Sequence, residues 1–450
     1  MSDWAEGYNG TSYTKNYFRE INPNYAAFAL LCAGIRPPKI RNACELGFGY
    51  GMSLNFHAST QNVNWYGNDY NSSQKNYASY ISESSNNSAI LTDKPFSKLS
   101  EADDWPKFDF IALHGIWTWV SIENQIAILK FIEEKLSDNG IVYISYNVAP
   151  TSSVFAPIKD LMRSKFQKGT ASNEPTKDRV LATLDYLDDF ARAGGNYLES
   201  TPVVGELIKN LRKRDLSYIQ GEYLGDHWNI ENFLTMNEKL ENLKLSYACG
   251  AGFLRTIDRI NFTNAQSQFL SRINDKAEKE FVADLFWAES FRTDYWIKGP
   301  FFVSEQEKSD SLSDFRVIQV KPISQVPKEF AGRSSRGSIK HAIFEAAIDL
   351  IERSSSISIK ELSDSLPDST IDTVIEMVRV FLALKFVDLE NNDRIFVKNG
   401  HSTSAELINN TLCRESVRQS NSVSYLCSPK TGCALHLSRY VLVYLHAWNM

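Results

Sequence analysis

A short stretch of this chain combines an acid with three regularly spaced glycines. An apolar run ends in Glu45, and Gly47, Gly49 and Gly51 follow at alternate positions. Glycine adopts positive φ and has no Cβ, so a ligand can lie directly against the main chain there. A helix that begins after such a loop points its first N–H groups into the same space. A GxGxxG dinucleotide site would need glycine at position 52, which is Met52, and the Gly-Lys-Ser/Thr of a Walker A loop is absent.

Polar residues end the other predicted strands. Asp69 follows the second strand, where an acid accepts hydrogen bonds from the ribose of either NAD or S-adenosylmethionine (SAM). Asp93 follows the third strand and is either an adenine contact or an ordinary loop acid. His114 ends the fourth strand and is a candidate base, while Tyr146 and Asn147 end the fifth. These strand ends are expected to meet at one crevice.

Strands and helices alternate over the first third of the chain. This order predicts an α/β fold with a doubly wound, Rossmann-like parallel sheet. The expected strands are 40–46, 63–68, 89–91, 108–113 and 141–146, and the expected helices are 52–59, 74–82 and 122–136. Two later apolar segments, 240–253 and 292–299, are predicted to join the same sheet.

The composition changes along the chain predict five parts. Residues 1–154 form the cofactor-binding core, and 226–303 complete it with the late strands. A helical insertion, 155–225, is expected above the substrate crevice, and 304–337 is expected to be a linker. The aromatic-rich start of the chain either packs on the sheet edge or covers the cofactor mouth.

The last part, 338–450, predicts a winged-helix-like α+β domain. Its helices are expected at 339–351, 357–362 and 371–384, before a hairpin of strands 386–389 and 394–397. The third helix contains Asp372, Glu376 and Arg379, so it is net negative and poorly suited to a DNA groove. A regulatory or substrate-docking role is therefore favoured for this domain.

The overall composition is that of a cytoplasmic globular protein. The 450 residues are 43% hydrophobic and carry a net charge of −6, which disfavours nucleic acid and anionic membranes as partners. No signal peptide or membrane-spanning run is visible, and the six cysteines are scattered, as expected for reduced thiols. No metal-ligand spacing is present. The oligomeric state is left open.

The motifs together resemble a known family. The Glu45–Gly51 stretch is similar to motif I of class I SAM-dependent methyltransferases. With the stretches 65–71, 114–120 and 143–147, it resembles the bacterial class I methyltransferases that carry a methyltransferase regulatory domain. Their relatives include the rickettsial protein-lysine methyltransferases of outer-membrane protein B. The resemblance continues at 218–229 and 291–299. Phe48 and Tyr50 in the loop, and Val-Ala-Pro-Thr after Asn147, depart from the family pattern.

The resemblance implies SAM as cofactor and a methyl acceptor as substrate. Glu45 would anchor the cofactor's amino group, the glycines its carboxylate, and Asp69, followed by Tyr70, its ribose. Tyr17 and Tyr146 are candidates to line the methyl-transfer channel by their position in the sequence only, and His114 would serve as base for an oxygen acceptor. A protein lysine is the expected acceptor. A glycan O-methyltransferase and a noncatalytic SAM-binding regulator are the alternatives.

Overall fold

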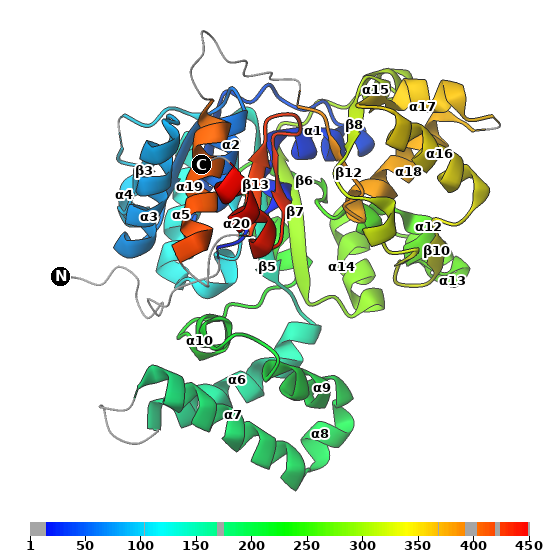
Figure 1. Ribbon diagram of the computed structural model, residues 1–450. Helices are drawn as coiled ribbons and strands as arrows, with labels where there is room; N and C mark the ends of the chain where they lie inside the picture. Colours follow the sequence, from blue (N-terminus) through cyan, green and yellow to red (C-terminus); the bar gives the residue numbers. More distant parts are fainter. Residues whose placement is uncertain are drawn as a thin grey trace.

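The computed structural model describes residues 15–102, 104–168, 175–367, 369–391, 403–418 and 424–448. A seven-stranded sheet lies at its centre, with a group of helices from the middle of the chain below it in Figure 1. Elements from the last third of the chain lie on the right of the sheet, and the C-terminal helices return over its left part. No helix among the described residues is long and apolar enough to cross a membrane.

The central sheet has the strand order β3-β2-β1-β4-β5-β7-β6. Strands β1 to β5 pair in parallel, whereas β7 runs antiparallel to β5 and β6. The strands are β1 Asn42–Leu46, β2 Asn64–Asn68, β3 Ile90–Thr92, β4 Phe108–Leu113, β5 Leu136–Asn147, β6 Leu245–Gly250 and β7 Phe291–Lys298. The predicted Rossmann-like sheet, with two late strands joined to it, is confirmed.

Helices cover both faces of this sheet because side chains alternate along each strand. Ala43 on β1 belongs to one apolar core and Cys44 and Leu46 to the other. The first core also contains residues of α1 and the second residues of α5 and α11. The helices of the domain that contains this sheet are α1 Pro23–Cys32, α2 Met52–Thr60, α3 Ser72–Ser85, α4 Phe96–Leu99, α5 Ile122–Lys135, α11 Phe233–Glu241, α12 Asp258–Asn261, α13 Asn264–Leu270 and α14 Lys276–Trp287.

The segment predicted as an insertion consists of helices with their own apolar core. Leu184, Val204 and Ile219 are buried together there, away from the sheet. Such a separate core allows the unit to keep its shape while it stands off the sheet in Figure 1. Its helices are α6 Thr151–Lys168, α7 Thr176–Ala193, α8 Asn196–Ser200, α9 Pro202–Leu211 and α10 Leu216–Leu224.

Residues 304–337, expected to be a linker, instead form regular structure. Helix α15 (Glu305–Ser313) is followed by β8 (Arg316–Gln319), and β9 (Glu329–Ala331) pairs with β10 (Arg336–Ser338). Strand β8 is the centre of a three-stranded antiparallel sheet. Leu312 and Val317 are buried, and this explains why the segment forms regular structure. A segment that buries apolar side chains packs against the rest of the protein and does not behave as a flexible linker.

The domain after β10 contains the three predicted helices, α16 Ala342–Arg353, α17 Ile359–Ser365 and α18 Ile371–Ala383. Strand β8 lies between β11 (Ile357–Ser358) and β12 (Val387–Leu389). The second hairpin strand, predicted at 394–397, lies outside the described residues. The winged-helix assignment therefore stays a prediction.

The C-terminal elements pack back on the core rather than extending the α16–α18 domain. They are α19 Ser404–Arg418, β13 Tyr425–Ser428, β14 Cys433–His436 and α20 Arg439–Trp448. Ile408 and Leu412 of α19 are buried with Phe56 of α2 and Ile81 of α3. This contact could not be predicted from the sequence, because the pattern of an amphipathic helix identifies its apolar face and not the surface against which that face packs.

Candidate active site

A cavity of about 820 Å3 lies between the carboxyl ends of the central strands and the helical insertion. Glu45, Gly47 and Gly49 border it from the end of β1, and His114 and Asn147 from the ends of β4 and β5. The helices α6, α9 and α10 close the other end. This is the crevice that a sheet of this topology is expected to offer a ligand.

The glycine loop presents bare main chain to the cavity at one position. Gly47, Gly49 and Gly51 have φ of +70°, +58° and +66°. A Cβ on Gly47 would lie 2.1 Å from the side chain of Ile116, and one on Gly51 would lie 2.6 Å from Ala78. A Cβ on Gly49 would meet no atom within 4 Å. The outer glycines thus permit close packing, and Gly49 leaves space for a ligand.

Glu45 supplies an unsatisfied carboxylate beside that space. Its side chain is 4% exposed, and Oε2 has no hydrogen-bond partner among the described residues. Burial, with a smaller contribution from Asp69, raises the pKa of Glu45 to about 8. A buried carboxyl in this condition favours a cationic partner, which would restore its charge.

Asp69 supports the loop instead of bordering the cavity. Its Oδ2 accepts a hydrogen bond from Gly49 N–H at 2.7 Å, and Oδ1 accepts one from Asn71 N–H at 2.9 Å. Burial raises the pKa of Asp69 to about 7, against the opposing effect of these two donors. The carboxylate thereby holds Gly49 in the conformation that opens the cavity.

Tyr70 and Asp93, two further predicted cofactor residues, also do not border the cavity. Asp93 is exposed, and its Oδ2 accepts a hydrogen bond from the Ser72 hydroxyl at 3.1 Å. That contact fits the ordinary loop acid that was its alternative interpretation.

His114 is a neutral residue in the cavity wall. Burial lowers the pKa of His114 to about 3. Its Nδ1 lies 2.8 Å from the Tyr143 hydroxyl, and the Phe18 ring stacks on the imidazole with centroids 3.6 Å apart. Phe18 and Asn16 border the cavity too, so the start of the described chain covers part of its mouth.

The structure corrects the placement of both predicted channel tyrosines. Tyr146 precedes the cavity residue Asn147 on β5, so its side chain points to the opposite face, where its hydroxyl donates to Asp294 at 3.0 Å. The Tyr17 hydroxyl lies 3.2 Å from Nε2 of buried His57. Neither phenol borders the cavity.

Sequence reasoning missed most of the far end of the cavity. Trp119 stacks with Trp228, with the two ring centroids 6.2 Å apart. Both rings border the cavity, as do Phe155 and Tyr223, whereas Trp117 is fully buried in the core. These residues are far apart in the sequence, so no local spacing could have indicated the wall.

Lys159 of α6 lies against this aromatic wall. Its Nζ is 4.5 Å from the ring centroid of Trp119 and 4.7 Å from that of Trp228, and it donates to the His227 carbonyl at 3.3 Å. Its side chain is 2% exposed. Burial, helped by the charge of Arg163, lowers the pKa of Lys159 to about 7. Burial beside these rings therefore shifts this amine toward its neutral form.

Comparisons with known proteins agree with this fold. A family model described as "Predicted methyltransferase regulatory domain" matches residues 215–298. The uncharacterized protein sll1526 of Synechocystis sp. is 27% identical, over 97% of this chain and 86% of its own length. The uncharacterized protein RP028 of Rickettsia prowazekii is 27% identical, over 49% of this chain and 87% of its own.

Among solved structures, PKMT2 from Rickettsia typhi in complex with AdoHcy matches with a TM-score of 0.71. Its sequence identity is 18%, and the match covers 97% of this chain and 88% of that one. This similarity shows the fold. The chain thus has a class I methyltransferase fold and a methyltransferase regulatory domain, as the sequence motifs indicated.

Proposed function

We propose that this protein is a SAM-dependent methyltransferase and that its acceptor is a protein lysine side chain. The proposal of SAM as cofactor rests on one observation. The free space beside the main chain of Gly49 lies next to the Glu45 carboxylate, whose Oε2 has no hydrogen-bond partner among the described residues. SAM carries an ammonium and a carboxylate on its methionine part. An ammonium suits the Glu45 carboxylate, and a carboxylate suits the N–H groups of the loop.

The residues present fit this cofactor, and its chemistry asks little of the protein. When bound, SAM supplies an activated methyl group on a sulfonium whose leaving group is a neutral thioether. Glu45 would hold the amino group and Gly47 and Gly49 the carboxylate end, while Asp69 keeps the loop in place. The protein must then orient an acceptor in line and present it unprotonated.

The far end of the cavity supports an amine acceptor. Lys159 is an amine that already lies against Trp119 and Trp228, and its pKa there is about 7. A substrate lysine against the cavity side of the same rings would be desolvated in a similar way and would lose its proton to solvent before transfer.

An oxygen acceptor fits the site less well. A sugar hydroxyl needs a base that takes up its proton as the methyl is transferred. His114, the base expected from the sequence, has a pKa of about 3, so it cannot keep a proton near neutral pH. The resemblance to rickettsial protein-lysine methyltransferases points in the same direction.

The test uses SAM labelled on the methyl group. The purified protein is incubated with labelled SAM and a fractionated bacterial extract, and the product is hydrolysed to identify the labelled unit. We expect label in methyl-lysine, and much less label at the same concentration of SAM when Glu45→Gln replaces the wild type. Label in a carbohydrate would reject the lysine acceptor alone. Absence of saturable S-adenosylhomocysteine binding by calorimetry would reject the enzyme as well.

A further inference from the structure

One side of the mouth of the active-site cavity is formed by Phe18, near the start of the described chain. Its ring stacks on His114 with centroids 3.6 Å apart, and its backbone N–H donates to the Ser53 hydroxyl at 2.9 Å. Ser53 lies in the first turn of α2, just after the glycine loop that borders the same cavity. Phe18 is therefore fixed beside the space where the cofactor is proposed to bind.

The next residue, Arg19, is held by a different part of the chain. Its Nη2 lies 2.8 Å from Oδ1 of Asp388 on β12, and its Nη1 donates at 2.6 Å to the Leu382 carbonyl near the end of α18. The Asp388 side chain is 1% exposed and that of Arg19 is 11% exposed. Solvent screens a pair this buried only weakly, and loss of one partner leaves the other charge uncompensated. The α16–α18 domain thus anchors the residue that follows Phe18.

The backbone at Phe18 directs these two neighbours to different sides. Phe18 has φ of −117° and ψ of 108°, an extended conformation in which successive side chains point in opposite directions. The Phe18 ring borders the cavity as a result, while the Arg19 guanidinium reaches Asp388. The peptide unit that joins the two residues is planar and stiff, so a displacement of Arg19 is transmitted to the Phe18 ring.

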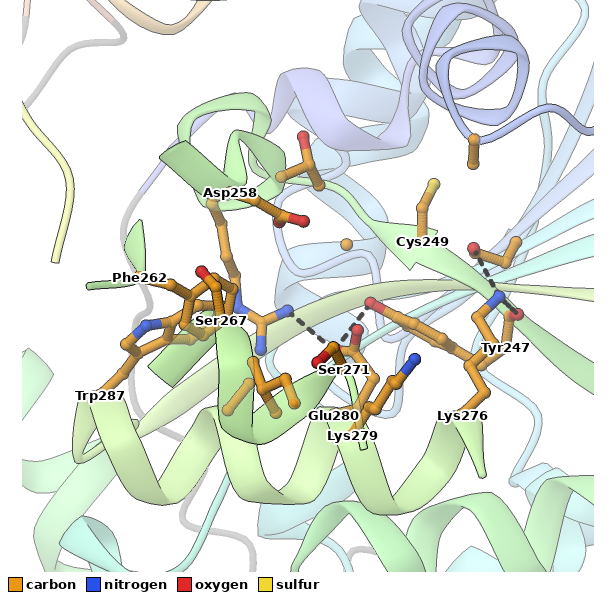
Figure 2. A pocket seen from close by; sticks show the side chains of 17 residues that line it. Tyr247, Cys249, Asp258, Phe262, Ser267, Ser271, Lys276, Lys279, Glu280 and Trp287 are labelled. Atoms are coloured by element: carbon orange, nitrogen blue, oxygen red, sulfur yellow. Dashed lines mark hydrogen bonds and ion pairs between the residues drawn. The ribbon is translucent and has the colours of Figure 1, made fainter. Parts of the chain in front are cut away.

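A second contact between this domain and the sheet domain lies elsewhere. Arg379 of α18 donates to the carbonyl of Thr256, the last residue of the short 3-10 helix Phe253–Thr256. Thr256 borders a separate cavity of about 520 Å3, whose other walls include β6, α13 and α14 (Figure 2). The two cavities share no lining residue. Arg379 therefore joins the same two domains outside the cavity that Phe18 borders.

We propose that Phe18 contacts the bound cofactor and that the Arg19–Asp388 ion pair positions Phe18, so that the α16–α18 domain sets the affinity for the cofactor. This inference rests on the proposed function, because it takes SAM as the ligand of the active-site cavity. Arg19 does not border that cavity and acts through Phe18. A change that separates Asp388 from Arg19 would release Phe18 and weaken cofactor binding. By linkage, the bound cofactor would strengthen the attachment of the domain.

Calorimetric titration of the full chain with S-adenosylhomocysteine measures the effect of each contact. Phe18→Ala should weaken binding about tenfold or more, because an aromatic contact with the ligand is lost. Arg19→Met should weaken it about fivefold or more, which is the lower end of typical coupling between two sites. Asp388→Asn keeps the shape of the side chain and should have the same effect as Arg19→Met, so the test does not depend on the folding of one variant.

Arg379→Met is the matched control, because it removes an arginine contact between the same two domains. It should lower the melting temperature and leave the affinity for S-adenosylhomocysteine unchanged. In the Arg19 variant the segment keeps another attachment at Asn22, whose Nδ2 donates to the Gly432 carbonyl at 2.9 Å. An affinity loss in Arg379→Met equal to that in Arg19→Met would overturn the proposal, since any weakening of the domain contact would then have the same result.

The double variant Phe18→Ala/Arg19→Met separates positioning from a general loss of stability. It should bind S-adenosylhomocysteine no more weakly than Phe18→Ala alone, because Arg19 acts through the ring that is missing. Additive losses, or wild-type affinity in both Arg19→Met and Asp388→Asn, would show that the ion pair does not position Phe18. Unchanged affinity in Phe18→Ala would reject this inference alone, whereas absence of binding by the wild type would reject the proposed function with it.

Discussion

The two ends of the 820 Å3 cavity differ in what forms their walls, which is main chain at one end and side chains at the other. The cofactor end is made by consecutive residues, with the open main chain of Gly49 beside the carboxylate of Glu45. The acceptor end is made by side chains from separate helices and loops, with Trp119, Trp228 and Phe155 among them. A ligand common to a whole family suits the first kind of site, and a ligand that varies among members suits the second.

The two ends also differ in the sign of their buried charge. Burial raises the pKa of Glu45 to about 8 and lowers that of Lys159 to about 7. Both shifts favour the neutral form, yet their consequences are opposite. An ammonium bound at the first end restores the charge of Glu45, whereas burial beside Trp119 and Trp228 shifts the Lys159 amine toward its neutral, nucleophilic form.

The largest effect on cofactor binding is expected from a substitution that fills the space beside the main chain of Gly49. Gly49→Val places a side chain in the empty space and strains a left-handed residue by about 1–2 kcal/mol. We expect affinity for S-adenosylhomocysteine to fall about 100-fold or more, equivalent to about 2.7 kcal/mol. Calorimetry measures this directly.

Gly34→Val is the matched control for this change. Gly34 also has positive φ, +74°, and open space around its Cβ position, but it lies outside the cavity. It should lose similar stability and keep its affinity for S-adenosylhomocysteine. Equal affinity losses in the two variants would mean that strain, and not occupation of the cavity, explains the result.

Glu45→Gln should have the next largest effect at the same end. It removes a charged hydrogen bond worth roughly 1.5–3 kcal/mol, so binding of S-adenosylhomocysteine should weaken by about one to two orders of magnitude. Wild-type affinity should increase as the pH rises towards 8, because the bound ammonium needs the ionised carboxylate. An unchanged pH profile in the variant would remove Glu45 from the site.

The same residue predicts how the stability of the free protein depends on pH. The pKa of Glu45 is about 8 in the folded chain and about 4.5 when unfolded, so between these values the folded state binds more protons. Its contribution to the free energy of unfolding is therefore full below pH 4.5 and is lost as the pH rises through 8. Glu45→Gln should flatten the fall in melting temperature between pH 5 and 8.

This contrast explains what could be predicted from the sequence. The strand that ends at Glu45 and the glycines after it are a local signal, because the turn requires positive φ within a few residues. The sheet and the cavity positions of Glu45, Gly49, His114 and Asn147 followed from it. Asp69 was found by the same reasoning, although the structure shows it bonded to Gly49 rather than bordering the cavity.

The acceptor end could not be predicted because it depends on tertiary packing. Lys159 looks like an ordinary polar position of a surface helix, and only the approach of Trp119 and Trp228 makes it buried. The segment 304–337 was misjudged for a related reason. Its polar composition suggested a linker, although the short strand β8 within it pairs with β11 and β12.

A smaller effect, confined to the acceptor end, is expected from Lys159→Met. The change keeps a flexible side chain of similar length and removes the amine together with its hydrogen bond to the His227 carbonyl and its contact with the two tryptophan rings. A looser aromatic wall should reduce kcat/KM for the proposed lysine acceptor roughly three- to tenfold. Affinity for S-adenosylhomocysteine should stay the same. Lys209→Met, at an exposed lysine of α9, is the control and should change neither value.

The smallest effect on methyl transfer is expected from the two tyrosines that the sequence placed in the channel. Tyr17→Phe removes a hydroxyl whose partner is His57, and Tyr146→Phe removes one whose partner is Asp294. Each should lower the free energy of unfolding by about 0.5–3 kcal/mol, and more for Tyr146, whose loss leaves a buried carboxylate with one donor fewer. Turnover per folded molecule should stay near that of the wild type, because neither hydroxyl borders the cavity. If either variant loses more activity than Lys159→Met while its melting temperature is unchanged, that tyrosine takes part in methyl transfer. The distinction between a cofactor end made of main chain and an acceptor end made of side chains would then be wrong.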